Sequence, residues 1–321
     1  MSSRVVVVTG ASSGIGKAAA LAFAARGDRL VLAARRPADL AAVALLAGGD
    51  PLVVPTDVTR HREVDDLAAA AVERFGRIDV WVDTAAVMAY GKFADVPVEI
   101  FDQVVTTDLL GSANVARTAL RRFREQGGGT LILTGSLLGQ ITAPYVSAYV
   151  TAKWGLRGLI RTLRQEFRDS PDIHICTVAP GSVDTPIYTS AANYAGFVGR
   201  PPPPVDSAER VGAAILRVAD RPRAQVSVGA ANWLIRTGFT VVPPVYDLLV
   251  GTLMGRFGLS RRRAAPAPGN VFEGRPRVEG GPGRWRRGQV GAVAAVGAGA
   301  VAVAGVRLWR GASGGAAGRR H

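Results

Sequence analysis

A chain of 321 residues with 48% hydrophobic residues can bury a sizeable core, which excludes an intrinsically disordered protein. Its single cysteine, Cys176, excludes a disulfide framework, and its three histidines show no metal-ligand spacing, so we expect no metal. The net charge of +14 is uneven: residues 1–258 hold 27 Lys and Arg against 23 Asp and Glu, whereas residues 259–321 hold 12 against 2. Because the charge belongs to the tail and no nucleic-acid-binding module accompanies it, we expect no nucleic-acid partner.

Short runs rich in β-branched residues alternate with longer helical patterns up to about residue 230. The valine-rich runs are typical of strands buried on both faces, as in a parallel sheet that helices cover. We expect strands at residues 4–9, 29–34, 51–55, 78–84, 130–135, 173–179 and 225–229, and helices at 14–26, 37–47, 60–75, 97–125 (where a break is left open), 147–169 and 206–220. The alternation predicts a doubly wound α/β sheet with right-handed crossovers and helices on both faces.

The remaining segments suggest how the chain is divided. We expect a catalytic domain over residues 1–235, in which residues 182–205 form the kind of long irregular loop that often acts as a lid or binding loop. An apolar extension follows at 236–258, and then a flexible Arg/Gly/Pro-rich linker at 259–288. Because the N-terminus enters a strand at once, it leaves no room for a signal peptide, and we expect a cytoplasmic catalytic domain.

The stretch "TGASSGIG" places Gly10, Gly14 and Gly16 where the first strand turns into the first helix. Glycine lets the backbone approach a pyrophosphate, and the helix N-terminus offers free N–H groups and a partial positive charge. A glycine triplet alone would also fit a tight turn. The strand before it and the helix after it are the context of a nucleotide site, so the motif predicts dinucleotide binding.

The second strand ends in "LAARR", which bears on the choice of cofactor. Sites selective for NAD usually keep an acidic residue near this strand end for the ribose hydroxyls, but here Ala34 is followed by Arg35 and Arg36. An arginine suits a 2′-phosphate because its guanidinium is planar and permanently charged. The alternative is a pair of solvated loop arginines. We predict that NADP(H) is preferred over NAD(H).

The stretch "YVTAK" puts Tyr149 and Lys153 four residues apart in an expected helix. Residues at positions i and i+4 share one helix face, with about 5–6 Å between their Cβ atoms. A phenol and an ammonium group at this spacing could act together on one substrate. The pair is also common by chance, so its meaning depends on the rest of the chain.

Four motifs together resemble the short-chain dehydrogenase/reductase family: "TGASSGIG" (9–16), Ser136, "YVTAK" (149–153) and "PGSVDTP" (180–186). They occur in the order and spacing of that family, and the resemblance covers roughly residues 4–230. It implies a Rossmann-like fold and an oxidoreductase that acts on CH–OH groups.

The resemblance also implies roles for individual residues. Tyr149 would be the general acid in carbonyl reduction or the base in alcohol oxidation, with Lys153 favouring the phenolate by its charge and bonding the nicotinamide ribose. Ser136 would hold the substrate oxygen, and Asp108 would take the fourth catalytic position. The implied cofactor contacts are Gly10, Ser12, Ser13, Gly14, Ile15, Gly16, Arg35, Asp57, Val58, Ala85, Tyr149, Lys153, Pro180, Val183 and Thr185.

The chain departs from the family pattern at two places. Residues 83–86 read Asp-Thr-Ala-Ala where family members usually carry Asn-Asn-Ala-Gly, and Asp108 stands where the family has an asparagine. That asparagine normally braces a helix distortion and holds a water that leads from Lys153. An aspartate accepts hydrogen bonds but cannot donate as an amide does. We expect a working site with a lower rate or an altered pH profile.

The tail contains a segment that could associate with a membrane. Residues 290–306 are seventeen uncharged residues, and Trp285 and Trp309 bracket them as interfacial aromatics often do. A helix over 289–310 would approach the roughly 20 residues that a bilayer requires. More arginines precede this segment than follow it, which would anchor the catalytic domain at the inner face of a membrane. The alternative is an Ala/Gly-rich tail that never enters a membrane.

These observations favour an NADP(H)-dependent oxidoreductase that interconverts a carbonyl and an alcohol on a hydrophobic small molecule. The apolar stretch "SLLGQITAPYVSAY" (136–149) and the loop at 186–205 suggest the pocket preference. The alternative is a catalytically weak or inactive nucleotide-binding protein that acts as a membrane-associated interaction module. The resemblance implies a homo-oligomer, packed through the helices around 97–125 and 147–169.

Overall fold

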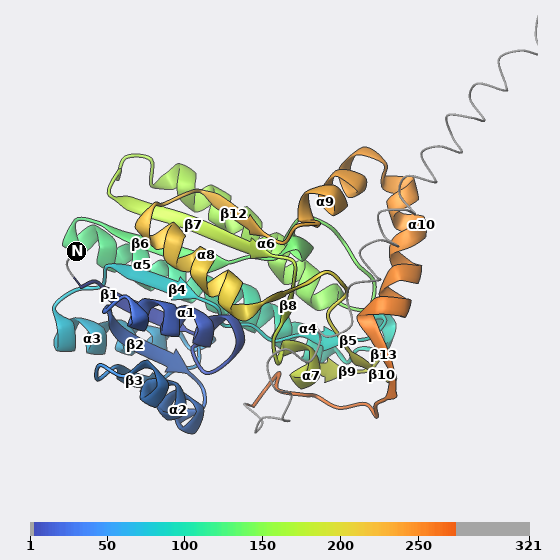
Figure 1. Cartoon of the computed structure of the whole chain (residues 1–321), viewed down its shortest axis with the longest axis horizontal. Coiled ribbons are helices and arrows are strands. Elements are labelled where there is room, and N and C mark those ends of the chain that lie inside the picture. The colour runs from blue at the N-terminus through green and yellow to red at the C-terminus, as the bar shows by residue number, and fades with distance from the viewer. Residues whose placement is uncertain (1–2, 274–321) are drawn as a thin grey trace, which may run out of the picture.

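A seven-stranded parallel sheet forms the centre of the protein in this computed structural model, which describes residues 3–273 (Figure 1). The strand order is β12-β7-β6-β4-β1-β2-β3, and every neighbouring pair is parallel. The strands are β1 (Val5–Thr9), β2 (Arg29–Ala34), β3 (Leu52–Pro55), β4 (Val80–Asp83), β6 (Gly129–Thr134), β7 (Ile173–Pro180) and β12 (Gln225–Val228). They are the seven strands expected from the sequence, and the predicted doubly wound, Rossmann-like α/β fold is confirmed.

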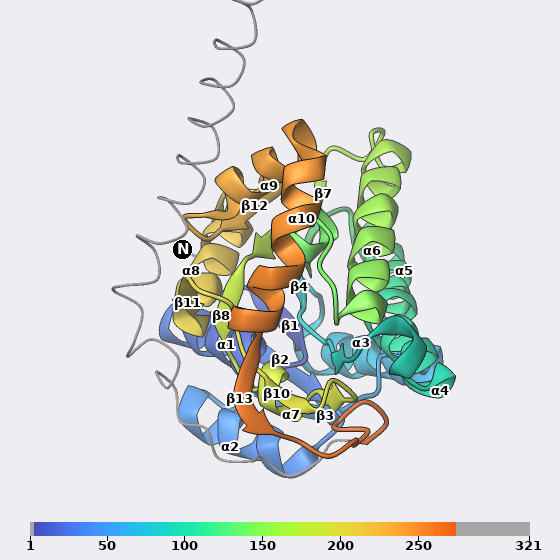
Figure 2. The same cartoon turned by 90° about the vertical axis from the view of Figure 1, so that its right-hand side faces the viewer.

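Helices cover both faces of the sheet, as Figures 1 and 2 show from two sides. One face carries α1 (Gly14–Ala25), α2 (Pro37–Ala47) and α8 (Ala208–Asp220), and the other carries α3 (His61–Phe75), α5 (Ser112–Gln126) and α6 (Ser147–Glu166). In β1, Val6 and Val8 enter the first core while Val5 and Val7 enter the second. The unbroken valine run therefore follows from burial on both faces.

The long helix expected at 97–125 is interrupted by a π-helical segment. Helix α4 (Val98–Val105) continues into η2 (Thr106–Gly111), where the helix is wound more widely, and then into α5. Segments of this kind are rare and often occur at functional sites. Here the segment carries Asp108 inward, where its side chain is fully buried.

The segment 182–205 contains short paired elements and is not an irregular loop throughout. The small elements of this region and its partners are β5 (Ala89–Tyr90), η1 (Phe93–Asp95), η3 (Leu137–Gly139), β8 (Ser182–Asp184), α7 (Ile187–Ser190), β9 (Ala192–Asn193), β10 (Phe197–Gly199) and β11 (Val205–Ser207). Strand β8 pairs with β11, and β5 pairs with β9. These contacts fix the segment beside the carboxyl ends of the sheet strands.

The apolar extension folds into two helices across the carboxyl end of the sheet (Figure 2). They are α9 (Asn232–Val241) and α10 (Pro243–Leu253), and the π-helical η4 (Met254–Gly258) follows. Strand β13 (Leu259–Arg263) then pairs with β10, and Val271 is fully buried. Residues 259–273, expected to be flexible linker, are thus packed onto the domain.

The expected membrane helix at 289–310 lies outside the described residues, as does the rest of the expected linker. Within residues 3–273, every helix is too short or too polar to cross a bilayer.

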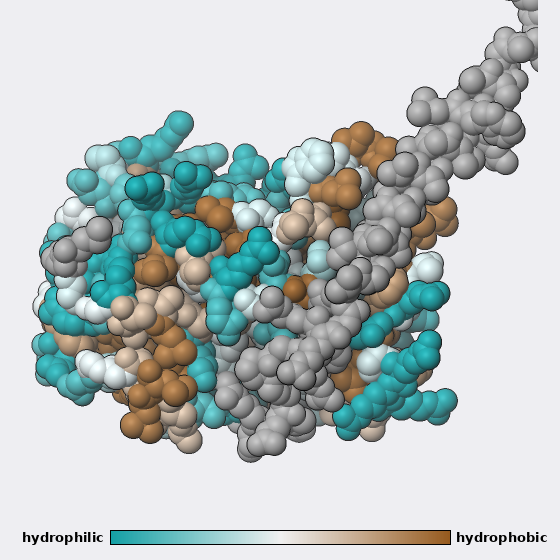
Figure 3. Space-filling view, in the orientation of Figure 1, coloured by the Kyte–Doolittle hydropathy of each residue, from teal (hydrophilic) through white to brown (hydrophobic). Residues whose placement is uncertain are grey.

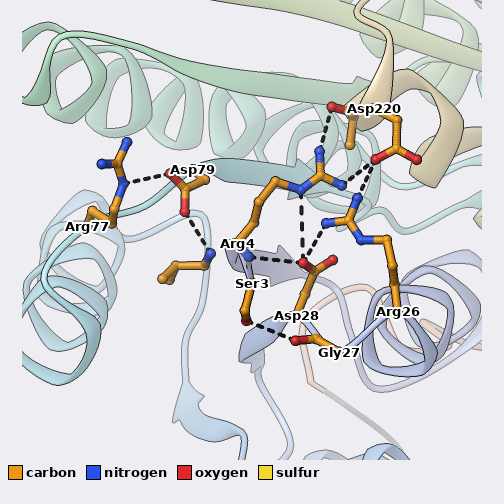
Figure 4. Close-up of polar contacts among 10 residues, drawn as sticks. Ser3, Arg4, Arg26, Gly27, Asp28, Arg77, Asp79 and Asp220 are labelled. Carbon is orange, nitrogen blue, oxygen red and sulfur yellow. Dashed lines mark hydrogen bonds and ion pairs between the residues drawn. The ribbon is translucent and has the colours of Figure 1, made fainter. Parts of the chain in front are cut away.

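A cluster of ion pairs ties the amino edge of the sheet together, opposite the site (Figure 4). Arg4 donates to the backbone oxygen of Ala219 and to Asp220, each at 2.7 Å, while Arg26 pairs with both Asp28 and Asp220. These bonds join the start of β1 to the ends of α1 and α8. These contacts stabilise the amino edge of the sheet.

Candidate active site

A cavity of about 800 Å³ lies at the carboxyl edge of the sheet, between the strand ends and helices α9 and α10. Ligands of doubly wound sheets bind at this edge. The structure places every predicted site residue except Asp108 in its lining: Gly10, Ser12, Ser13, Gly14, Ile15, Gly16, Arg35, Asp57, Val58, Ala85, Ser136, Tyr149, Lys153, Pro180, Val183 and Thr185. Residues far apart in the chain are therefore brought together as the motifs predict.

The glycines form a cradle with no room for side chains. A Cβ atom on Gly16 would lie 2.2 Å from the backbone oxygen of Gly10 and 2.4 Å from Oγ1 of Thr84. Gly10 has a φ of +78°, a conformation that glycine adopts at little cost. Helix α1 begins at Gly14, so its free N–H groups point into this cradle. The geometry fits an anionic group at the helix N-terminus.

Arg35 lines the cavity, but its guanidinium is already engaged by the chain itself. It donates to the backbone oxygens of Asn270 at 2.8 Å, Phe272 at 2.9 Å and Val271 at 3.3 Å. Partial burial lowers the pKa of Arg35, and the charge of Asp57 acts in the opposite direction. The C-terminal segment therefore lies at the place predicted for a 2′-phosphate.

Tyr149, Ser136 and Lys153 lie together at the middle of the cavity wall. Tyr149 is in the first turn of α6, is buried and is hydrogen-bonded to Ser136, whose Oγ also accepts from the backbone N–H of Leu138 at 3.1 Å. The Lys153 Nζ donates to the backbone oxygen of Thr134 at 3.2 Å and lies 5.5 Å from the centre of the Tyr149 ring. The i, i+4 spacing thus brings the phenol and the ammonium group to one site.

The surroundings of Tyr149 shift its pKa away from that of a free phenol. Burial raises the pKa of Tyr149 well above its ordinary value, and the charge of Asp108 raises it further, while the hydrogen bond to Ser136 lowers it. The phenol is accordingly protonated at neutral pH.

Asp108 lies behind Lys153, outside the cavity lining. Its Oδ1 accepts from the backbone N–H of Val87 at 2.8 Å, while its Oδ2 lies 4.0 Å from the Lys153 Nζ and has no hydrogen-bond partner among the described residues. Burial raises the pKa of Asp108 to about 7, even though the charge of Lys153 lowers it. The carboxyl group therefore titrates near neutral pH.

The unusual segment 83–86 is accommodated by hydrogen bonds. Asp83 accepts from Oγ1 of Thr9 at 2.8 Å, from Oγ of Ser112 at 2.6 Å and from the backbone N–H of Ala85 at 3.2 Å. Thr84 donates from its hydroxyl to the backbone oxygen of Thr9 at 2.7 Å. An aspartate at position 83 is thus matched by hydroxyl donors.

Among the aromatic residues of the lining that the sequence did not single out are Tyr188 and Tyr246. Burial raises the pKa of Tyr188, and the charge of nearby Tyr149 adds to this effect, so the two phenols are neighbours. Tyr188 follows the "PGSVDTP" motif by two residues, a position that could have marked it. Much of the remaining lining comes from α9, α10, η4 and the residue that joins the two α-helices: Leu234, Ile235, Val242, Val245, Tyr246, Leu249, Val250, Leu253, Met254 and Phe257.

Comparison with known proteins places these motifs in a family. The family model described as short chain dehydrogenase matches residues 4–194. An uncharacterized oxidoreductase of Bacillus subtilis (strain 168), YxnA, is 31% identical over 295 residues, which cover 89% of this chain and 80% of that protein.

Solved structures agree with the observed fold. An alcohol dehydrogenase from the archaeon Thermococcus sibiricus, complexed with 5-hydroxy-NADP, has a TM-score of 0.62 and 27% identity, covering 71% of this chain and 96% of that one. A short chain dehydrogenase/reductase from Burkholderia phymatum, in complex with NAD, has a TM-score of 0.68 and 22% identity, covering 76% and 95%, and shares the fold. With the motifs in register on a matching fold, the chain belongs to the short-chain dehydrogenase family and is an oxidoreductase of that family.

Proposed function

We propose that the protein is an NADP(H)-dependent oxidoreductase that interconverts a carbonyl and an alcohol on a hydrophobic small molecule. The observation that carries this proposal is the position of Ser136, Tyr149 and Lys153 in one cavity. On one side of them is the glycine cradle, and on the other is the apolar wall of α9 and α10.

A nicotinamide cofactor fits the cradle, because the space against Gly10 and Gly16 excludes side chains and the N-terminus of α1 faces it. When bound, the cofactor would supply or accept the hydride. Thr185 approaches Gly14, so the "PGSVDTP" segment would close over the nicotinamide end.

The preference for NADP(H) is supported by Arg35 and Arg36 at the end of β2, both in the cavity lining, where an acidic residue would favour NAD. The comparison proteins include one complexed with 5-hydroxy-NADP and one with NAD. Because these proteins differ in their cofactor, the proposed preference rests on the positive charge at the end of β2.

The chain's own groups would act on the substrate oxygen. Ser136 would hold that oxygen through its hydroxyl, and Tyr149, protonated at neutral pH, would donate its proton as the carbonyl is reduced. Lys153 would stabilise the resulting phenolate by its charge.

The test is consumption of NADPH by the purified protein with a panel of hydrophobic ketones and aldehydes. Tyr149→Phe should abolish turnover while NADPH binding persists. Tyr194→Phe serves as a control, since Tyr194 is not among the residues that line the cavity. If the protein binds NADPH but shows no turnover that depends on Tyr149, it is a nucleotide-binding protein with little or no activity. Asp83 and Asp108, which depart from the family pattern, would then explain the low activity.

We further expect a homo-oligomer packed through the helices around 97–125 and 147–169. The exposed Val98 and Leu110 on this face support that expectation. We also expect the catalytic domain to face the cytoplasm. Anchoring through residues 289–310 stays a prediction that fractionation with and without residues 285–321 would test.

A further inference from the structure

Helices α9 and α10 are apolar on two sides. Their inner side lines the cavity, but their outer side is exposed: Trp233 is 67%, Val241 70% and Leu248 77% exposed, and none of the three lines the cavity. In α10 no residue is buried, and in α9 Asn232 alone is. Figure 3 shows hydrophobic residues gathered where Figure 1 places α9. An exposed apolar patch of this kind marks an interaction surface.

The inner side of the helix pair is firmly attached to the domain. The ring of Phe239 packs against the rings of Trp154 on α6 and Tyr246 on α10, with distances between ring centres of 6.3 Å and 5.2 Å. The hydroxyl of Tyr246 donates to the backbone oxygen of Thr142 at 2.7 Å. The outer residues are therefore presented by a fixed scaffold.

The segment that carries this surface is positively charged overall. Residues 232–263 contain five arginines and a single acidic residue, Asp247. The charges of Arg161 and of Arg236 on α9 add to burial in lowering the pKa of Arg157 on α6, so positive charge extends from α9 towards α6. Exposed Trp and Leu side chains beside arginines are typical of helices that lie in the surface of an anionic bilayer.

The surface is also the outer wall of the substrate cavity. Leu234, Val242, Leu249 and Leu253 line the cavity and are each at least 40% exposed, so apolar surface is continuous from the exterior to the interior. A hydrophobic compound dissolved in a bilayer could reach the cavity along these residues without crossing water.

We propose that the outer face of α9 and α10, centred on Trp233, Val241 and Leu248, docks on an anionic lipid bilayer. A lipid-dissolved carbonyl compound or alcohol enters the cavity between these helices. The identity of the cargo rests on the proposed function, whereas the docking itself does not. Charge complementarity and continuity with the cavity favour a bilayer over a second copy of the chain, which would cover the entrance.

The docking is tested with the full chain and vesicles of phosphatidylcholine with phosphatidylglycerol, some carrying lipids brominated on their acyl chains. The signal from Trp233 is the difference in fluorescence between the natural protein and Trp233→Phe, so that the other four tryptophans cancel. We expect brominated lipid to reduce this difference signal by roughly twofold or more, as for a side chain inserted at the boundary of the acyl chains. Bound protein with an unquenched Trp233, or no binding at all, would overturn the proposal.

A matched pair of variants separates this face from other sources of affinity. Trp233→Ser, Val241→Ser and Leu248→Ser together should weaken vesicle binding roughly tenfold or more. Leu45→Ser and Leu46→Ser together, which change similarly exposed apolar residues elsewhere, should leave it unchanged. Circular dichroism checks that both proteins fold.

If the first variant keeps full vesicle affinity but loses an oligomer in a light-scattering measurement, the face is a protein interface and the proposal fails. Turnover of a water-soluble ketone that depends on Tyr149 is measured in parallel. If the natural protein docks on vesicles but shows no such turnover, the proposed function alone is refuted. If it shows the turnover but does not dock, the docking alone is refuted.

Discussion

The Asp108 Oδ2 lies 4.0 Å from the Lys153 Nζ, and both side chains are almost completely buried. The pair is connected to Tyr149, since the charge of Asp108 raises the pKa of that phenol. A π-helical segment carries the aspartate to this position, and the N–H of Val87 holds it there. The charge state of one buried carboxyl group is thereby coupled to the proposed acid and base.

Asp108→Asn should raise the rate of alcohol oxidation above pH 7. The pKa of Asp108 is raised to about 7, so its carboxyl group is neutral below that pH and charged above it. Removing the charge lowers the pKa of Tyr149, so that the phenolate needed as base forms more readily. One pKa unit equals about 1.36 kcal/mol, or a factor of ten, and we expect kcat for oxidation to rise roughly three- to tenfold. Well below pH 7 the variant and the natural protein should have similar rates. The measurement is kcat for oxidation as a function of pH.

The control for this experiment is Asp102→Asn, an exposed aspartate on α4 that should change neither rate nor pH profile. A gain that is equal at all pH values would contradict the assignment, because it would not follow the titration of Asp108. An unchanged or lower turnover above pH 7 would do so as well.

The same titration should be visible in stability. Because the folded-state pKa of Asp108 is raised, the folded protein binds an extra proton between about pH 4 and pH 7, and stability falls as the pH rises through this window. Asp108→Asn should therefore be more stable than the natural protein at about pH 8, by up to a few kcal/mol, and by much less at about pH 5. Urea unfolding at the two pH values measures the difference, and a gap of equal size at both would count against the shifted pKa.

The sheet could be predicted from the sequence because strands buried on both faces are unbroken runs of apolar residues, as in the valines of β1. The sequence also predicted the cavity residues because glycine at a helix start and a Tyr-Lys pair on one helix face are local patterns. It missed features that depend on distant contacts. The pKa of Tyr149 is raised by burial and by the charge of Asp108, which is distant in the sequence. Residues 259–273 are held on the domain in part because β13 pairs with β10. Composition alone made that segment look like a linker.

Arg35→Ala should reduce selectivity for NADPH. Hydrogen bonds to a charged group contribute about 1.5–3 kcal/mol, so KM for NADPH should rise roughly ten- to a hundredfold while KM for NADH stays nearly constant. In the structure the same guanidinium binds the backbone oxygens of residues 270–272. A phosphate would have to share or displace those contacts.

Arg62→Ala, which removes an exposed arginine of α3, is the control for this substitution. Steady-state kinetics with both cofactors and a thermal unfolding curve distinguish two roles. If Arg35→Ala lowers Tm but leaves the ratio of the two KM values unchanged, Arg35 holds the C-terminal segment and does not select the cofactor.

Two Gly→Ala substitutions in helices should have opposite effects. In α6, a Cβ on Gly158 meets no atom within 4 Å, so Gly158→Ala should stabilise the protein by about 0.5–1 kcal/mol through helix propensity. In α1, a Cβ on Gly16 would collide with the backbone of Gly10 and with Thr84, so Gly16→Ala should cost roughly 1–3 kcal/mol and displace the cradle.

Thermal unfolding with and without NADPH measures both effects. We expect Gly158→Ala to keep the rise in Tm that NADPH causes and Gly16→Ala to lose most of it, because only the second position shapes the space that the cofactor would fill. An undiminished rise for Gly16→Ala would place the cofactor elsewhere in the cavity.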